Sequence, residues 1–333
     1  MPADIDLDQL ATGIRAGERA WIARGITLVE SKRPEHRILA SDLLHRLTNA
    51  QSALSSRIGV TGIPGAGKST FIEAFGTFLI EKGNRVGVLA VDPSSRKTGG
   101  SILGDKTRMP RLAASPNAFI RPSPSGDHLG GVARATRESM TILEAAGYNV
   151  IIVETVGVGQ SEYAVADMVD TFLLLMVART GDNLQGIKRG ILELADIIAV
   201  NKADGDNVRA AQRSARELAA AIRLLQGAQH TWQTPVVSCS ALEATGIEDL
   251  WEHVTAQRNL LTATGELDHR RREQRIMWMR RLIEQTLLDD FYNTPEIHQV
   301  LHTLEDQVRA AQTDPYTATQ IALTRYRTLK SAD

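Results

Sequence analysis

A nine-residue stretch, GIPGAGKST at residues 62–70, constrains the fold of this chain more than any other feature. It matches the pattern G-x-x-x-x-G-K-[ST], with Gly62, Gly67, Lys68 and Ser69 at the fixed positions. The β-type run IGV precedes it and the helical run FIEAFGTFLIEK follows it. In that context, consecutive backbone N–H groups and the helix N-terminus can surround phosphate oxygens. The stretch therefore predicts a nucleoside triphosphate site on a strand–loop–helix unit.

Two side chains of this phosphate loop have predicted chemical roles. Lys68 would neutralise charge on the β- and γ-phosphates, and the Ser69 hydroxyl would coordinate Mg²⁺. The alternative is a glycine-rich turn that only joins two core elements, but the flanking runs favour the nucleotide site. The residues predicted to line the phosphates are Gly62, Ile63, Pro64, Gly65, Ala66, Gly67, Lys68, Ser69 and Thr70.

Short β-rich runs alternate with helical stretches across the middle of the chain. The predicted strands are Arg57–Gly62, Arg85–Val91, Ala118–Arg121, Val150–Thr155, Thr171–Val177, Ile197–Asn201 and Pro235–Cys239. The predicted helices include Lys68–Lys82, Arg134–Ala146, Ile187–Ala195, Asn207–Leu225 and Ile247–Leu260. This alternation predicts an α/β fold with a mostly parallel central sheet flanked by helices.

Apolar residues at helical spacing predict an extension at each end of this region. The N-terminal part carries them at Leu10, Ile14, Leu39 and Leu43, among others. The C-terminal part has three predicted helices, two of which begin with proline. These helices are Asp268–Asp290, Pro295–Ala311 and Pro315–Leu329. The predicted division is a helical extension at 1–56, a nucleotide-binding domain at 57–261 and a helical region at 262–333.

A second motif, NKAD at residues 201–204, follows the β-branched run DIIAV. It is therefore expected at the carboxyl end of a strand, where α/β sheets bind ligands. Guanine presents two adjacent N–H donors that the Asp204 carboxylate can accept together, and adenine does not. Lys202 can lie along the ring, and Asn201 can tie this loop to the phosphate loop. The motif favours GTP over ATP. The run SAL is predicted to reach the guanine carbonyl oxygen through its backbone amides: Ser240, Ala241 and Leu242.

The run ETVGVGQSE follows the apolar run NVIIV and contains an acidic residue at a predicted strand end, Glu154. Such a carboxylate beside the phosphate loop belongs near Mg²⁺, and the Gly157 N–H can face the γ-phosphate. Most GTPases place Asp there, so the longer Glu154 side chain could reach the metal's water shell or orient the attacking water. Gln160 is a second candidate for positioning that water, with a helix-cap or surface role as an equal alternative.

Further polar side chains follow other predicted strands. Asp92 and Asp105 are predicted Mg²⁺ ligands, although Asp105 could instead cap a helix. Asp182, Gln185 and Lys188 lie in a loop after the run TFLLLMVA and are predicted to form a switch, with an ordinary solvated loop as the alternative. The predicted catalytic residues are Lys68, Asp92, Asp105 and Glu154, and the predicted metal ligands are Ser69, Asp92, Asp105 and Glu154.

Composition excludes several functional classes. A formal net charge of −1 gives no indication of a nucleic-acid or membrane-surface partner. The one cysteine, Cys239, excludes an internal disulfide and a cysteine-cluster metal site. The most apolar window, 171–178, is far shorter than the roughly 20 residues that span a bilayer, and the polar start does not resemble a secretory signal. A cytoplasmic protein is expected.

Two patterns in the C-terminal part concern its surface. The densest basic run, HRRREQR at residues 269–275, is interpreted as a solvated helix face rather than a phosphate site. Apolar residues at helical spacing, Ile276, Met279, Ile283 and Leu287, suggest a helix face that seeks a partner. Intramolecular core is the alternative for that face.

The motifs together resemble a known family. GVTGIPGAGKST, VLAVDPSSRKTGGSILGDKTRM, IRPSPSGDHLGG, VETVGVGQSE, GDNLQGIK and NKADGD, in this order, are similar to the methylmalonyl-CoA mutase-associated GTPases. This MeaB/ArgK group also includes the human methylmalonic aciduria type A protein. The similarity runs from about residue 10 to about residue 280. One difference is the run PSPSGDHLGG, where relatives often carry Ser-Ser-Gly or Thr-Ser-Gly.

The resemblance implies a homodimeric GTPase of the SIMIBI class whose C-terminal region dimerises. It implies a chaperone that gates adenosylcobalamin loading into methylmalonyl-CoA mutase and protects that enzyme. It also implies that Lys68, Ser69, Asp92, Asp105 and Glu154 line a GTP–Mg²⁺ site. The alternatives are a chaperone of a related cobalamin-dependent acyl-CoA mutase, a P-loop kinase or ATPase acting on a transport protein, a metal-delivery GTPase, and a GTP-gated scaffold with little turnover.

Overall fold

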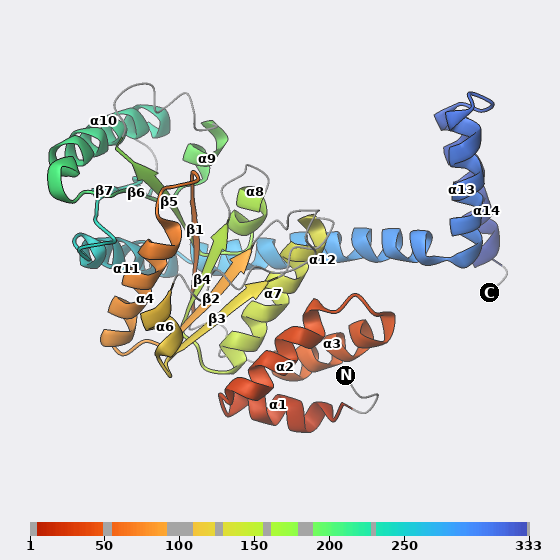
Figure 1. The fold of residues 1–333 in the computed structure, drawn as a ribbon, viewed down its shortest axis with the longest axis horizontal. Helices are drawn as coiled ribbons and strands as arrows, with labels where there is room; N and C mark the ends of the chain where they lie inside the picture. Colours follow the sequence, from red (N-terminus) through yellow and green to blue (C-terminus); the bar gives the residue numbers. More distant parts are fainter. Residues whose placement is uncertain are drawn as a thin grey trace. The chain divides into compact units, whose positions relative to one another are not determined.

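The computed structural model describes residues 5–48, 55–91, 109–123, 129–155, 161–178, 189–227 and 231–331 of the chain. These residues form a seven-stranded sheet in the order β3-β2-β4-β1-β5-β6-β7 (Figure 1). Each pairing among the described strands is parallel. The α/β fold with a parallel sheet and flanking helices is therefore confirmed.

The strands agree closely with the predicted ones. They are β1 (Ser56–Gly62), β2 (Val86–Val91), β3 (Ala118–Ser123), β4 (Val150–Thr155), β5 (Thr171–Val177), β6 (Ile197–Asn201) and β7 (Val236–Ser238). The carboxyl end of β1 lies between β4 and β5: Val60 lies opposite Glu154 of β4, and Gly62 lies opposite Leu175 of β5. The chain reverses direction across the sheet at β1, so the loop after β1 opens at a topological switch point.

Apolar side chains on both faces of the sheet explain why it is covered on both sides. In β4, Ile151 and Val153 join one buried cluster, and Val150 and Ile152 join another. On one side the cover is α4 (Lys68–Glu81), α6 (Pro110–Ala114) and α11 (Ile247–Ala263); on the other side it is α7 (Leu129–Ala145), α8 (Ser161–Ala166), α9 (Arg189–Leu194) and α10 (Val208–Gln226). A strand buried on both faces reads as a continuous apolar run, which is the pattern of β4 and β5.

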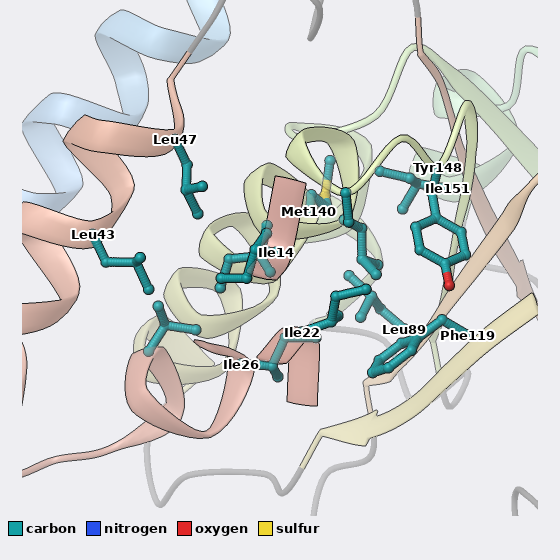
Figure 2. Close-up of a cluster of buried hydrophobic side chains, with 14 of the residues drawn as sticks. Ile14, Ile22, Ile26, Leu43, Leu47, Leu89, Phe119, Met140, Tyr148 and Ile151 are labelled. Atoms are coloured by element: carbon teal, nitrogen blue, oxygen red, sulfur yellow. The ribbon is translucent and has the colours of Figure 1, made fainter. Parts of the chain in front are cut away.

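The N-terminal helices extend this core. They are α1 (Leu7–Arg15), α2 (Arg19–Glu30) and α3 (Pro34–Leu47). Figure 2 shows Ile14, Ile22 and Ile26 gathered with Met140 of α7 and Phe119 of β3 in one buried cluster. Residues 1–272 accordingly form one compact unit, and residues 273–333 form a second. The three-part division of the chain stays a prediction.

The second unit is a small helical body. It comprises the rest of α12 (Glu266–Asn293), α13 (Pro295–Arg309) and α14 (Pro315–Lys330). Its buried apolar cluster contains Leu304, Ala318 and Ala322. The predicted stripe on α12 is exposed, with Ile276, Met279, Ile283 and Leu287 between 40% and 58% accessible. The alternative that this stripe is intramolecular core is therefore wrong within the described chain.

The amino end of the sheet holds a group of buried ion pairs. Arg271 of α12 binds both carboxylate oxygens of Asp170 at 2.8 and 2.6 Å and the Ser55 carbonyl at 2.7 Å. Arg57 of β1 binds both carboxylate oxygens of Glu144 at 2.7 and 2.9 Å. Arg270 donates to the Asp170 carbonyl at 2.6 Å. Arg270 and Arg271 thus fasten the first turns of α12 to the sheet. Interpreting the whole HRRREQR run as a solvated face is therefore wrong, because an acidic side chain lies opposite part of it in the fold.

Among the described residues, no helix is both long enough and apolar enough to cross a membrane.

Candidate functional site

The phosphate loop joins β1 to α4 at the centre of the sheet. Gly65 and Gly67 have φ of +83° and +84°, which a glycine adopts without strain. Gly62 is required by close packing, because a Cβ there would lie 2.4 Å from the Leu175 carbonyl oxygen. The backbone N–H groups in the first turn of α4 have no intrahelical partners, as in any helix. No side-chain N-cap binds them either. This arrangement suits phosphate oxygens.

Lys68 and Ser69 contact groups of the neighbouring strands. The Lys68 ammonium donates to the Gly62 carbonyl at 2.8 Å, which folds its side chain over the loop. The Ser69 hydroxyl donates to Glu154 Oε1 at 3.3 Å. Both oxygens are hard donors of the kind that Mg²⁺ prefers, so the two residues fit a magnesium site. Within the described residues, no group of three or more His, Cys, Asp or Glu side chains is arranged to hold a metal ion.

Burial lowers the pKa of Lys68, and the carboxylates of Glu154 and Glu162 oppose that shift. The sequence motif around Glu154 also contains Glu162, for which we made no prediction. The structure places Glu162 in α8 with 1% of its surface exposed, within electrostatic range of the loop lysine. The sequence places Glu162 at the start of a helix, but only the packing of α8 brings it near Lys68.

The predicted guanine-binding residues converge at the ends of β6 and β7. Asn201, 1% exposed, donates from Nδ2 to the Ala66 carbonyl of the phosphate loop at 2.8 Å. Its Oδ1 accepts the Ala241 N–H at 3.0 Å. The predicted tie between the NKAD loop and the phosphate loop is therefore present, and the same side chain also holds the SAL loop. A Cβ at Gly67 would approach Asn201 Nδ2 to 3.0 Å, so this contact also restricts position 67.

Asp204 lies on the open side of this junction. Its Oδ2 accepts the Ser240 hydroxyl at 2.6 Å, which fixes the plane of the carboxylate. The neighbouring Lys202 is exposed and has a φ of +62°, an uncommon conformation that tertiary contacts must hold. One short loop therefore presents an exposed lysine and an oriented carboxylate.

The backbone amides of the SAL run are only partly available. The Ser240 N–H donates to the Thr245 carbonyl, and the Ala241 N–H donates to Asn201. Leu242 is 79% exposed, and its N–H has no acceptor among the described residues. Of the three amides predicted to reach the guanine carbonyl oxygen, the Leu242 N–H is therefore the one that is available to donate.

Several predicted site residues lie outside the described parts of the chain. They are Asp92, Asp105, Gly157 and Gln160 around the phosphates, and the switch residues Asp182, Gln185 and Lys188. The described ends of these loops lie at the carboxyl edge of the sheet, at Val91, Thr155 and Ala178. There the Thr155 hydroxyl donates to the Thr61 hydroxyl at 2.8 Å, which joins the ends of β4 and β1 beneath the phosphate loop.

Known proteins share this architecture along almost the whole chain. A protein of Mycobacterium tuberculosis described as a probable GTPase is 56% identical over 317 residues, covering 95% of this chain and 94% of the relative. The GTPase ArgK of Escherichia coli is 50% identical over 279 residues, covering 84% of each chain. The mouse mitochondrial methylmalonic aciduria type A homolog is 44% identical over 330 residues, covering 96% of this chain and 80% of the relative.

A crystal structure described as a LAO/AO transport system kinase superposes with a TM-score of 0.74 at 38% identity, covering 98% of this chain and 99% of that one. The family model for the methylmalonyl Co-A mutase-associated GTPase MeaB matches residues 22–296. That match includes the phosphate loop, Glu154, Asn201, Asp204 and the SAL run. The chain therefore belongs to the MeaB family of methylmalonyl-CoA mutase-associated GTPases.

Proposed function

We propose that this GTPase binds GTP with Mg²⁺, hydrolyses it, and acts as a chaperone that gates adenosylcobalamin loading into methylmalonyl-CoA mutase and protects that enzyme. The family match over residues 22–296 carries the proposal, because it spans the nucleotide site and names the mutase as the associated protein. Guanine nucleotide is supported separately by the geometry of Asn201 and Asp204.

Lys68 is the residue proposed to stabilise charge on the transferring phosphoryl group. Its ammonium binds the Gly62 carbonyl, and burial disfavours its charged form. A β/γ-phosphate pair supplies the negative charge that this desolvated ammonium lacks. Ser69, Glu154, Asp92 and Asp105 are proposed to hold Mg²⁺, which would neutralise charge between the β- and γ-phosphates when bound.

The base end is proposed to select guanine before any chemistry occurs. Asp204 accepts the two guanine N–H donors, and the hydrogen bond from Ser240 holds its carboxylate in plane for both. Lys202 covers one face of the ring, and the Leu242 N–H donates to the carbonyl oxygen. Because Asn201 binds both the phosphate loop and the SAL loop, one GTP molecule engages both ends of a single connected unit.

The second unit, 273–333, is proposed to dimerise. Its own buried apolar cluster is small, while Ile276, Met279, Ile283 and Leu287 expose apolar surface along α12. A matching face on a second copy would remove this surface from water, which contributes roughly 25 cal/mol of favourable free energy per Å² of apolar area buried.

The loop with Asp182, Gln185 and Lys188 is proposed as the switch that responds to the mutase. We expect the complex to act in the cytoplasm.

The test measures GTP turnover and cofactor transfer together. Phosphate release from GTP should rise when the purified methylmalonyl-CoA mutase from the same organism is added. Release of adenosylcobalamin into the apo-mutase should depend on the nucleotide state, compared between GDP, GTP and a non-hydrolysable GTP analogue. Equal rates with and without the mutase, together with nucleotide-independent cofactor loading, would contradict the chaperone proposal.

A second candidate comes from the structural relative described as a transport system kinase. A kinase that uses ATP gains nothing from the oriented Asp204 carboxylate, which adenine cannot engage. Competition between GTP and ATP for the nucleotide-free protein separates the two candidates. Tight ATP binding with weak GTP binding would favour the kinase.

A third candidate is a chaperone of a related cobalamin-dependent acyl-CoA mutase. The same phosphate-release and cofactor-loading assays, repeated with isobutyryl-CoA mutase, would show which mutase is the client.

A further inference from the structure

The outer face of helix α10 carries a row of four arginines. Arg209, Arg213, Arg216 and Arg223, here called the arginine stripe, are spaced by four, three and seven residues, which places them along one line of an α-helix. All four are exposed. The opposite face of α10 is buried through Ala211, Ala215, Leu218 and Ile222. The stripe is therefore the part of α10 that points furthest from the sheet.

The arginine stripe is not neutralised by the described part of the chain. None of its four guanidinium groups has an ion pair or side-chain hydrogen bond there. Elsewhere, exposed arginines do have carboxylate partners: Arg309 on α13 binds Glu305 and Asp306 within the same helix. On α10 the one acidic residue is Glu217.

This arrangement is unfavourable for the isolated helix. Like charges three and four residues apart on a helix repel each other and destabilise it. The first turn of α10 contains no acidic residue and does contain Arg209, the wrong sign for the positive end of the helix dipole. A stripe that weakens its own helix and binds nothing in the described chain is better explained by an external ligand than by stability.

Exposed apolar side chains lie at the C-terminal end of the same helix. Leu224 is 86% exposed and Leu225 is 49% exposed. The buried face of α10 is formed by other residues, such as Leu218 and Ile222. Leu224 lies on the solvent side next to Arg223. Arginine is enriched at protein–protein interfaces, and the fully buried centre of an interface is more apolar than its rim.

The position of α10 connects this surface to the nucleotide. Asp204, the predicted guanine ligand, is followed by a short 3-10 turn at Gly205–Asn207 and then directly by α10. Arg209 is therefore five residues from the base-recognition carboxylate. A protein bound along the stripe would contact the element that leads out of the guanine site.

We propose that the outer face of α10 is a docking surface for an acidic face of the client protein, with Leu224 inserted between that protein's apolar side chains. This inference rests on the proposed function, because it assigns the surface used by the cobalamin-dependent mutase. An acidic protein face fits better than nucleic acid for two reasons. The chain carries a net charge of −1, and the exposed leucines beside the arginine stripe would gain nothing from contact with phosphate groups.

The test uses the full-length chain and the methylmalonyl-CoA mutase from the same organism, with binding kinetics measured by surface plasmon resonance at 50 and 200 mM salt. The double variant Arg213→Glu/Arg216→Glu should lower the association rate constant at least about tenfold at low salt and flatten its salt dependence, because steering is lost. Leu224→Ser should raise the dissociation rate constant about three- to tenfold. Basal GTP hydrolysis and the far-UV circular dichroism spectrum should remain those of the wild type.

Matched variants separate the stripe from net charge. Arg33→Glu/Arg111→Glu changes the charge equally at exposed arginines outside α10 and should bind as the wild type does. Arg213→Lys/Arg216→Lys keeps the charge and should retain most of the association rate.

If the wild type binds the mutase and the α10 reversal binds equally well, the docking surface is refuted while the chaperone function stands. If the wild type fails to bind the mutase at all, the proposed function fails and the docking surface with it. Tighter binding of the stripe to a DNA duplex or to phosphatidylserine vesicles than to the mutase would refute the choice of partner.

Discussion

The two ends of the central sheet both carry charged side chains, but they use them differently. At the amino end, Arg271 and Asp170 form a two-bond ion pair with both side chains almost fully buried. Arg57 and Glu144 form a second one, and the Arg57 N–H also donates to Asp170 at 2.9 Å. Each of these charges has a partner of opposite sign with near-ideal geometry.

At the carboxyl end the contacts of the charged groups are looser. Lys68 binds a backbone carbonyl rather than a carboxylate, and Ser69 reaches Glu154 at 3.3 Å. Burial disfavours the charge on Lys68. The groups at this end are thus arranged for a ligand that brings its own charge, in line with the general rule that α/β sheets bind ligands beyond the carboxyl ends of their strands.

The comparison teaches that buried charge alone does not mark a functional site in this fold. Paired charges at the amino end hold α12 to the strands, and removing one partner leaves the other uncompensated. At the carboxyl end, burial disfavours the charge on Lys68, and a bound triphosphate would compensate that charge. The two ends should therefore respond oppositely when a charge is removed: one loses stability, and the other loses function.

The largest effect is expected for Lys68→Ala. GTP hydrolysis should fall on the order of 10³–10⁵-fold, the range for loss of a cation that stabilises the transferring phosphoryl group, or roughly 4–7 kcal/mol. Single-turnover phosphate release with saturating GTP and Mg²⁺ measures it. Wild-type turnover in this variant would refute the phosphate-loop assignment.

The same variant should not lower the free energy of unfolding of the nucleotide-free protein. Because burial lowers the pKa of Lys68, the folded protein holds this proton less tightly than the unfolded chain does. The charged amine therefore destabilises the fold at pH values below its folded pKa, and this cost disappears as the pH rises through the unfolded value. Urea titration at neutral pH should give a variant as stable as the wild type or more so. A loss of stability would show that Lys68 also has a structural role.

Arg271→Ala should have the next largest effect, on stability instead of nucleotide binding. It leaves Asp170 buried without its two-bond partner, at a cost of about 3–5 kcal/mol in the free energy of unfolding. Urea titration measures this loss, and GTP affinity should stay unchanged at a temperature where the variant is folded. The neighbouring exposed Arg272→Ala is the control, expected within about 0.5 kcal/mol of the wild type. Equal effects of the two substitutions would contradict the distinction between paired and solvated arginines.

Much of the fold could be predicted from the sequence because its signals are local. Strands β4, β5 and β6 have the predicted bounds, since each is a continuous apolar run with polar residues at its ends. The arginine-rich start of α12 could not be interpreted locally. Its partner Asp170 precedes Arg271 by 101 residues, and helical spacing does not reveal what lies opposite a side chain.

The candidate site divides in the same way. The phosphate loop and NKAD are short motifs in which spacing determines geometry, so Lys68, Asn201 and Asp204 could be identified. The two-way contact of Asn201 with the SAL loop could not, because it depends on the adjacent ends of β6 and β7. Glu162 was missed because its motif was interpreted through Glu154, and only the packing of α8 places it near Lys68.

A smaller but more specific effect is expected for Asp204→Asn, a change of base preference. The variant replaces an oriented carboxylate by an amide that can accept only one guanine N–H, so GTP affinity should fall by about 1.5–3 kcal/mol, the contribution of a hydrogen bond to a charged group. Xanthine carries a carbonyl oxygen where guanine carries its amino group, and the asparagine N–H₂ can donate to it. Affinity for xanthosine triphosphate should therefore rise as affinity for GTP falls, with both measured by competition against a fluorescent analogue.

Ser240→Ala keeps the carboxylate but removes the hydroxyl that orients it, and should weaken GTP binding by about 0.5–1.5 kcal/mol without any gain for xanthosine triphosphate. An unchanged preference in Asp204→Asn would mean that the base is recognised elsewhere, and the carboxyl end of the sheet would then select only the triphosphate.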